Sequence, residues 1–148
     1  MLMDNAIEIL IVEDNPNDAE LTIRTLEKNN LSNRILWLED GEQALDFLKG
    51  RGDYEGRNTK HKPKVIFLDL KLPKMSGIEV VQKIRQEPNL EQIPVVMMTS
   101  SQEQKDRLQG YQNGVNSYIV KPLDFPEFTE AINDVGYYWL VLNRPPND

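Results

Sequence analysis

The sequence has no cysteine and a single histidine, His61. The first absence excludes disulfides, thiolate catalysis and cysteine-ligated zinc, and the second excludes a metal site built on a pair of histidines. Apolar runs are short, far below the ~20 residues needed to cross a bilayer. The N-terminal residues Met1–Asn5 carry neither a basic region nor an apolar core, so no secretion signal is predicted. These absences favour a cytoplasmic protein without a membrane anchor.

Length and composition predict one globular domain. The 148 residues suffice for one hydrophobic core and are too few for two. Apolar residues make up 39% and charged residues 28%, which argues against disorder. We expect a single domain over 1–148, with its core from about residue 6 to 142, flexible ends and no output domain. The formal charge of −7 repels a phosphate backbone, so no direct nucleic-acid binding is expected.

Five short apolar runs, rich in isoleucine and valine, predict the strands. They are Ile7–Val12, Ile35–Leu38, Val65–Leu68, Ile93–Met98 and Tyr118–Val120. The runs are nearly continuous rather than alternating, which is typical of parallel strands covered by helices on both faces.

Segments with helical spacing follow each run. The first three segments have apolar positions at Ala19, Ile23 and Leu26, at Ala44, Leu45 and Leu48, and at Ile78, Val81 and Ile84; the second is predicted to end near Gly50 and the third at Pro88. The fourth segment is Gln102–Asn113, in which Leu108 and Tyr111 are predicted to face inward. The last predicted helix runs from Phe125 to about Leu142. A strand–helix unit repeated five times implies parallel pairing through right-handed crossovers.

One stretch, Arg51–Lys64, is long for a loop between a helix and a strand. It holds five Lys or Arg against two acids. We interpret it as a solvated insertion in preference to a nucleic-acid patch, with His61 exposed.

Chemically useful side chains follow the predicted strands. In an open parallel sheet, ligands bind beyond the carboxyl ends of the strands. Glu13 and Asp14 follow the first run, Asp69 the third, Thr99 the fourth and Lys121 the fifth. Each alone is as readily a helix cap or a surface group. Together, three carboxylates, a hydroxyl and an ammonium at one edge would repel or desolvate one another without a ligand.

A divalent cation accounts for this set. Mg²⁺ prefers oxygen ligands and keeps water positions that a phosphate oxygen can take. Asp14 and Asp69 could ligate the metal, with Glu13 holding it through water. Lys121 and the Thr99 hydroxyl could then bind phosphoryl oxygens. The remaining carboxylate oxygen of Asp69 would be the nucleophile that forms an acyl phosphate.

Four stretches resemble the receiver domains of two-component response regulators, at the spacings that family shows. They are Ile9–Asn15, Ile66–Gly77, Pro94–Ser100 and Tyr118–Pro122, and together they span nearly the whole chain. The resemblance implies a flavodoxin-like (βα)5 three-layer sandwich whose parallel five-stranded sheet has the order 2-1-3-4-5. It also implies a phosphoacceptor switch in a phosphorelay, not an enzyme that turns over an external substrate.

The resemblance assigns roles at the acidic end. Asp69 takes the place of the phosphoacceptor, and Glu13 and Asp14 take that of the acidic pair that binds Mg²⁺ or Mn²⁺. The backbone carbonyl of Lys71 would complete the protein's share of the metal ligands.

The switch residues are assigned in the same way. Thr99 matches the hydroxyl that moves toward the phosphoryl group, Tyr118 the aromatic that swings inward behind it, and Lys121 the phosphate-binding lysine. The Lys121–Pro122 peptide is cis in similar proteins.

Within the family, the chain is similar to single-domain regulators that partner bacteriophytochrome-type sensor histidine kinases. The features behind this are the 51–64 loop with its Gly52–Glu55 opening, Asn89–Val96, and the aromatic stretch Gly136–Leu140. The resemblance implies a histidine kinase as donor and a downstream protein or relay partner as reader. It also implies a homodimer through the fourth helix, fifth strand and fifth helix. Apolar crowding from Tyr137 to Leu142 fits either packing on the sheet or a partner surface.

Three alternatives remain at this point. A phosphatase of the haloacid-dehalogenase type also uses a strand-end aspartate and Mg²⁺, but it places a second aspartate where this chain has Lys71. A dinucleotide-binding domain would need a glycine-rich turn after the first strand, where this chain has Glu13–Pro16. A scaffold that keeps the fold without the switch is disfavoured because every matched residue is intact.

Overall fold

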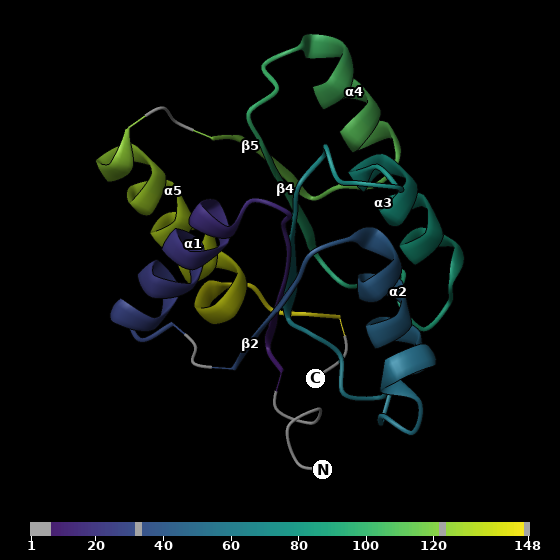
Figure 1. Cartoon of the computed structure of the whole chain (residues 1–148). Helices are drawn as coiled ribbons and strands as arrows, with labels where there is room; N and C mark the ends of the chain where they lie inside the picture. Colours follow the sequence, from purple (N-terminus) through teal and green to yellow (C-terminus); the bar gives the residue numbers. More distant parts are fainter. Residues whose placement is uncertain (1–6, 32–33, 122–123, 147–148) are drawn as a thin grey trace.

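The computed structural model describes residues 7–31, 34–121 and 124–146. Within them, five parallel strands alternate with five α-helices (Figure 1). The strands are β1 (Ile9–Val12), β2 (Ile35–Leu38), β3 (Val65–Leu68), β4 (Val95–Thr99) and β5 (Ser117–Val120). The helices are α1 (Pro16–Lys28), α2 (Gly41–Lys49), α3 (Gly77–Gln86), α4 (Gln104–Gln112) and α5 (Phe125–Tyr137). A short 3-10 helix, η2 (Gly52–Tyr54), follows α2, and a π-helical turn, η3 (Tyr138–Leu142), continues α5.

The strand order is β2-β1-β3-β4-β5, which confirms the predicted sheet. Figure 1 shows α1 and α5 on one face and α2, α3 and α4 on the other. Alternate strand residues therefore enter two cores: Leu10, Val12, Ile66, Leu68, Val95 and Met97 face α2 and α3, and Ile9, Ile11, Val65, Phe67, Val96 and Met98 face α1 and α5. None of the described helices is long and apolar enough to span a membrane.

Capping residues fix the helix ends in the structure, and the predicted end of α2 near Gly50 is confirmed. The side chain of Asn15 accepts hydrogen bonds from the amides of the first turn of α1, and Asp40 does the same for α2. Ser76 and Glu79 form a reciprocal capping box at α3. Gly50 ends α2 with a φ of 67°, in the left-handed region that glycine adopts without a Cβ clash.

Some predicted boundaries shift. β1 begins at Ile9 rather than Ile7, and β4 begins at Val95 rather than Ile93 because Pro94 has no N–H to donate to the ladder. The predicted last helix is α-helical to Tyr137 and then widens into η3, where Trp139 and Leu140 pack against the second core.

The predicted inward face of α4 is wrong. Leu108 is 56% exposed and Tyr111 49% exposed, and the only residue of α4 that is buried is Gly110. A Cβ added at Gly110 would lie 3.4 Å from the ring of Tyr118 on β5. The helix therefore turns its smallest residue to the sheet, and this close approach rotates Leu108 and Tyr111 outward.

The 51–64 loop is exposed over most of its length, as expected, including at His61. Arg57 departs from the predicted solvated insertion because it is buried. Its guanidinium lies 3.9 Å from the Phe47 ring centroid and donates hydrogen bonds to the carbonyls of Phe47 and His61. This arginine fixes the loop to α2.

Gly77, the first residue of α3, passes directly against the backbone that follows β3. A Cβ at this position would lie 2.3 Å from the Asp69 carbonyl oxygen and 2.9 Å from Leu70 Cα. The Gly77 amide also donates to the Leu70 carbonyl at 2.7 Å. Only glycine allows α3 to begin this close to Asp69.

Gly77→Ala should therefore displace the Asp69 backbone as well as strain the domain. The expected loss in unfolding free energy is about 1–3 kcal/mol, as for overpacked sites, with weaker Mg²⁺ binding. Ser76→Ala is the matched control: it removes a helix cap at a cost of about 1 kcal/mol but leaves room beside Asp69. Thermal melts and Mg²⁺ titrations compare the two. Equal Mg²⁺ affinity in both variants would contradict the role of Gly77 in placing Asp69.

Candidate functional site

Sheet register brings the predicted site residues together. Val12 of β1 pairs with Leu68 of β3, so the residues that follow, Glu13 and Asp69, leave the sheet side by side. Thr99 of β4 pairs with Val120 of β5, which places Lys121 at the same edge. The Asp69 amide donates to the Val12 carbonyl at 3.0 Å and continues the ladder one residue past the strands.

Glu13, Asp14 and Asp69 form a cluster of carboxylates. Each offers an oxygen, and these oxygens lie within 4.8 Å of one another. Glu13 and Asp69 are buried, with relative exposures of 6% and 8%, whereas Asp14 is exposed. At such a separation two unit charges repel by about 3 kcal/mol at an effective dielectric near 20. Converging hard oxygen donors with one open side fit a divalent cation that keeps water ligands.

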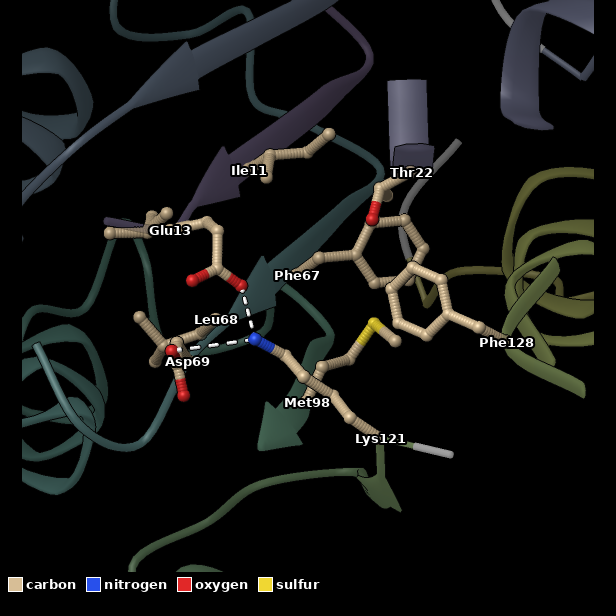
Figure 2. A pocket seen from close by; sticks show the side chains of 10 residues that line it. Ile11, Glu13, Thr22, Phe67, Leu68, Asp69, Met98, Lys121 and Phe128 are labelled. Atoms are coloured by element: carbon tan, nitrogen blue, oxygen red, sulfur yellow. Dashed lines mark hydrogen bonds and ion pairs between the residues drawn. The ribbon is translucent and has the colours of Figure 1, made fainter. Parts of the chain in front are cut away.

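Lys121 balances this charge (Figure 2). Its Nζ lies 2.6 Å from Glu13 Oε1, 2.8 Å from Asp18 Oδ2 and 3.6 Å from Asp69 Oδ2, and its side chain is 12% exposed. The ammonium has three N–H donors, of which two are taken by Glu13 and Asp18. Lys121 thus lies beside Asp69, but its hydrogen bonds go to the two other carboxylates.

Burial and charge shift the pKa values of this group. Burial raises the pKa of Glu13 to about 7; the nearby Asp69 charge adds to the rise, and the hydrogen bond from Lys121 opposes it. Burial lowers the pKa of Lys121, but its hydrogen bonds to Asp18 and Glu13 outweigh burial and hold that pKa above its ordinary value. The lysine is therefore a permanent cation, while Glu13 can take up a proton near neutral pH.

Thr99 and Tyr118 are joined through the turn after β4. Thr99 is fully buried, and its Oγ1 accepts a hydrogen bond from the Ser101 amide at 3.2 Å. The Tyr118 hydroxyl donates to the Ser101 carbonyl at 3.3 Å, and the Ser101 hydroxyl donates to Asp106 in α4 at 2.6 Å. A movement of Thr99 can thus reach β5 and α4 through Ser101.

Asp18 and Ser101 were not predicted. Asp18 lies in the first turn of α1, a position that sequence reasoning assigns to helix capping, and nothing in its neighbours signals a lysine more than a hundred residues away. Ser101 is the last of three consecutive hydroxyl residues, Thr99-Ser100-Ser101, and nothing in the sequence distinguishes it from Ser100. Pro122 lies outside the described residues, so the expectation of a cis Lys121–Pro122 peptide is not tested.

Comparison with known proteins identifies the family. Residues 9–133 match the response regulator receiver domain. The chain belongs to this family. Receiver domains are the phosphoacceptor modules of two-component signalling.

Relatives and solved structures agree with this assignment. The probable methanogenesis regulatory protein FilR2 of Methanothrix harundinacea is 41% identical over 138 residues, which cover 93% of this chain and 86% of FilR2. Mn²⁺-bound Rcp1, a Synechocystis response regulator, superposes with a TM-score of 0.85 at 34% identity, covering 93% of this chain and 97% of Rcp1.

Two phytochrome-linked regulators are also similar. The phosphorylated cyanobacterial phytochrome response regulator RcpA has a TM-score of 0.87 at 31% identity, covering 94% of this chain and 97% of RcpA. The bacteriophytochrome response regulator RtBRR has a TM-score of 0.74 at 51% identity, covering 94% and 83%.

The raised pKa of Glu13 predicts how metal binding depends on pH. Because a proton on Glu13 must leave before its carboxylate can attract a cation, Mg²⁺ affinity should fall by about tenfold per pH unit below the Glu13 pKa and level off above it. Tryptophan fluorescence provides the readout, since the Trp37 indole donates to the Glu13 carbonyl at 2.7 Å. The Glu13→Gln variant should bind Mg²⁺ weakly, with an affinity that does not change with pH. If the affinities of the wild type and of the variant changed with pH in parallel, the prediction would be refuted.

Proposed function

We propose that Asp69 accepts a phosphoryl group from a sensor histidine kinase, with Mg²⁺ or Mn²⁺ bound beside it by Glu13, Asp14, Asp69 and the Lys71 carbonyl. The observation that carries the proposal is the position of Asp69: its carboxylate belongs to an acidic cluster that fits a cation and also lies 3.6 Å from the ammonium of Lys121. Phosphoryl transfer needs this arrangement of charge and position more than it needs covalent machinery. The cation, when bound, would neutralise negative charge on the phosphoryl oxygens.

Residues of this chain orient Asp69, attack the phosphoryl group and bind the product. The backbone amide of Lys71 donates to Asp69 Oδ1 at 3.3 Å and orients the carboxylate. One Asp69 oxygen forms a bond to phosphorus as the nitrogen–phosphorus bond of the kinase's phosphohistidine breaks. Lys121 and the Thr99 hydroxyl then bind phosphoryl oxygens. Lys71 stands where a phosphatase of the haloacid-dehalogenase type has its second aspartate, so the protein acts as a phosphoacceptor and not as a phosphatase.

Ser101 transmits the change. When the Thr99 hydroxyl turns to a phosphoryl oxygen, the Ser101 amide loses its acceptor, and the hydrogen bonds from Ser101 to α4 and from Tyr118 to Ser101 must adjust. Tyr118 then swings inward behind Thr99. The result is a changed surface on α4 and β5, which a downstream protein or relay partner reads.

The relatives support a more specific proposal for the kinase that donates the phosphoryl group. The 51% identity to RtBRR supports a bacteriophytochrome-type kinase as the phosphoryl donor, acting in the cytoplasm. We also propose a homodimer through α4, β5 and α5, with no direct contact to nucleic acid. Leu108, Tyr111 and Phe125 support the dimer, because they expose 56%, 49% and 64% of their surface on these helices.

Phosphorylation by acetyl phosphate tests the central proposal. Intact-mass measurement should show one added phosphoryl group in the presence of Mg²⁺ and none with EDTA. Asp69→Asn keeps the shape of the side chain and should not be labelled. Labelling of that variant, or undiminished labelling in EDTA, would refute the assignment.

Asp18 and Lys121 should have opposite effects on binding of beryllofluoride, a phosphoryl mimic. Asp18→Asn removes a carboxylate that competes for Lys121, so affinity should rise roughly fivefold, a value discounted for the partial exposure of Asp18. Lys121→Ala should bind the mimic more weakly and leave the Tyr118 amide shift unchanged. Isothermal titration and NMR measure these effects; unchanged or weaker binding by Asp18→Asn would show that the contact does not restrain Lys121.

The dimer proposal predicts a difference between two pairs of exposed residues. Leu108→Asp with Tyr111→Asp should shift sedimentation at tens of micromolar toward the monomer. Gln43→Asp with Gln86→Asp, on exposed sites of α2 and α3, changes the same charge outside the proposed interface and should have no effect. Runs with and without beryllofluoride show whether pairing needs the phosphoryl group. A wild-type monomer under both conditions, or dissociation by the Gln43 and Gln86 pair alone, would rule out the proposed interface.

A further inference from the structure

A groove at the opposite end of the sheet has no part in phosphoryl transfer. It has a volume of about 560 Å³, within the ~300–1,000 Å³ of ligand pockets. Its walls come from three segments: the end of the 51–64 loop, the connection between α3 and β4, and the stretch from η3 to Pro146, which runs below the strands in Figure 1. Lys64, the residue before β3, lines the groove. Asp69 follows the other end of β3, about 16 Å from Lys64 along an extended chain.

The charge of this groove is opposite to that of the chain. Lys60, Lys62, Lys64 and Arg144 line it, and no described Asp or Glu does. Lys64 forms an ion pair with Glu8 at 3.1 Å. Among the described residues, Lys60, Lys62 and Arg144 have no ion-pair partner, although the chain has 24 acids against 17 bases. Such a grouping concentrates positive potential at one place on an acidic domain.

Part of the groove's lining is apolar and packed against the core. Trp139 and Leu140 lie half-buried there, anchored against the second core. Pro63, Pro94 and Pro145 contribute to the walls; their φ angles are fixed and they offer no N–H. The groove therefore offers a ligand both apolar contact, at Trp139 and Leu140, and positive charge.

The cations of the groove come from two separate segments. Lys60 stands in a turn in which the His61 amide donates to the Asn58 carbonyl at 3.2 Å, and Lys62 and Lys64 follow before β3. Arg144 lies in the stretch after η3. Cations on two chain segments suit carboxylates spread along a peptide, whereas a compact phosphate needs converging donors.

We infer that this groove binds an acidic segment of a partner protein, with carboxylates paired to Lys60, Lys62 and Arg144 and an apolar side chain on Trp139. The net charge of the domain does not prevent this, because potentials decay over a Debye length of about 8–10 Å at physiological salt and the groove's own cations are closest. The contact is independent of phosphorylation at Asp69. It would hold a partner at one end of the sheet while the other end changes state.

The probe is a fluorescein-labelled peptide of alternating glutamate and leucine, titrated into the full chain. Lys60→Glu with Lys62→Glu should weaken binding about tenfold, from the summed effect of two reversed surface charges. Lys28→Glu with Lys83→Glu changes net charge equally on exposed helical sites away from the groove and should bind as wild type. A peptide with lysine in place of glutamate should not bind, and affinity should fall with added salt.

The location is checked by NMR on the labelled full chain. Amides lining the groove should shift with the acidic peptide, and those beside Asp69 and Thr99 should not. Equal loss of binding in both double variants, shifts confined to the Asp69 end, or tighter binding of a single-stranded oligonucleotide than of the peptide would each overturn the inference. So would self-association through the groove, seen as peptide binding that weakens as protein concentration rises.

Discussion

The ammonium of Lys121 is the interaction on which the functional edge of this protein depends. It joins Glu13 and Asp18 from the N-terminal part of the chain to a residue 108 positions beyond Glu13. Without it, buried Glu13 and Asp69 would face each other uncompensated, and a buried charge that loses its partner costs several kcal/mol. The same contacts restrain the lysine, because Lys121 donates its hydrogen bonds to Glu13 and Asp18 and not to Asp69, the proposed phosphoacceptor. A cation and a phosphoryl group would redistribute these charges instead of entering a neutral pocket.

The fold serves this charge arrangement through backbone register and one close approach. Parallel pairing of β1 with β3 and of β4 with β5 ends these strands at one edge of the sheet. Glu13, Asp69 and Lys121, each directly after its strand, therefore emerge at the same edge as Thr99, the last residue of β4. Gly77 then lets α3 begin directly against the Asp69 backbone. Apart from these contacts, apolar packing holds the domain together. Alternate residues of each strand enter one of two apolar cores, which bury the two faces of the sheet.

The sequence was sufficient to predict the strands, the helix order, the acidic cluster and the lysine, because each has a local signature. Apolar runs mark buried strands, and ligand residues follow strand ends. Three features had no such signature. The rotation of α4 depends on the close approach of Gly110 to Tyr118, which no periodicity encodes. The Asp18–Lys121 pair joins residues whose separation in sequence gives no hint of contact. Arg57, read as part of a solvated loop, is buried because Phe47 and two carbonyls receive it.

The wrong prediction for α4 bears on how a chemical change at Asp69 could reach the surface. A helix held by a single buried glycine has few apolar contacts to break, and such elements have the lowest local stability in a domain. Its start is tied by Ser101 to Thr99 on one side and to Tyr118 on the other. Two exposed apolar side chains, Leu108 and Tyr111, are a cost that a well-packed helix would avoid. A helix that must change position cannot be fixed deeply in the core, so loose packing and an apolar outer face are what a movable contact surface requires.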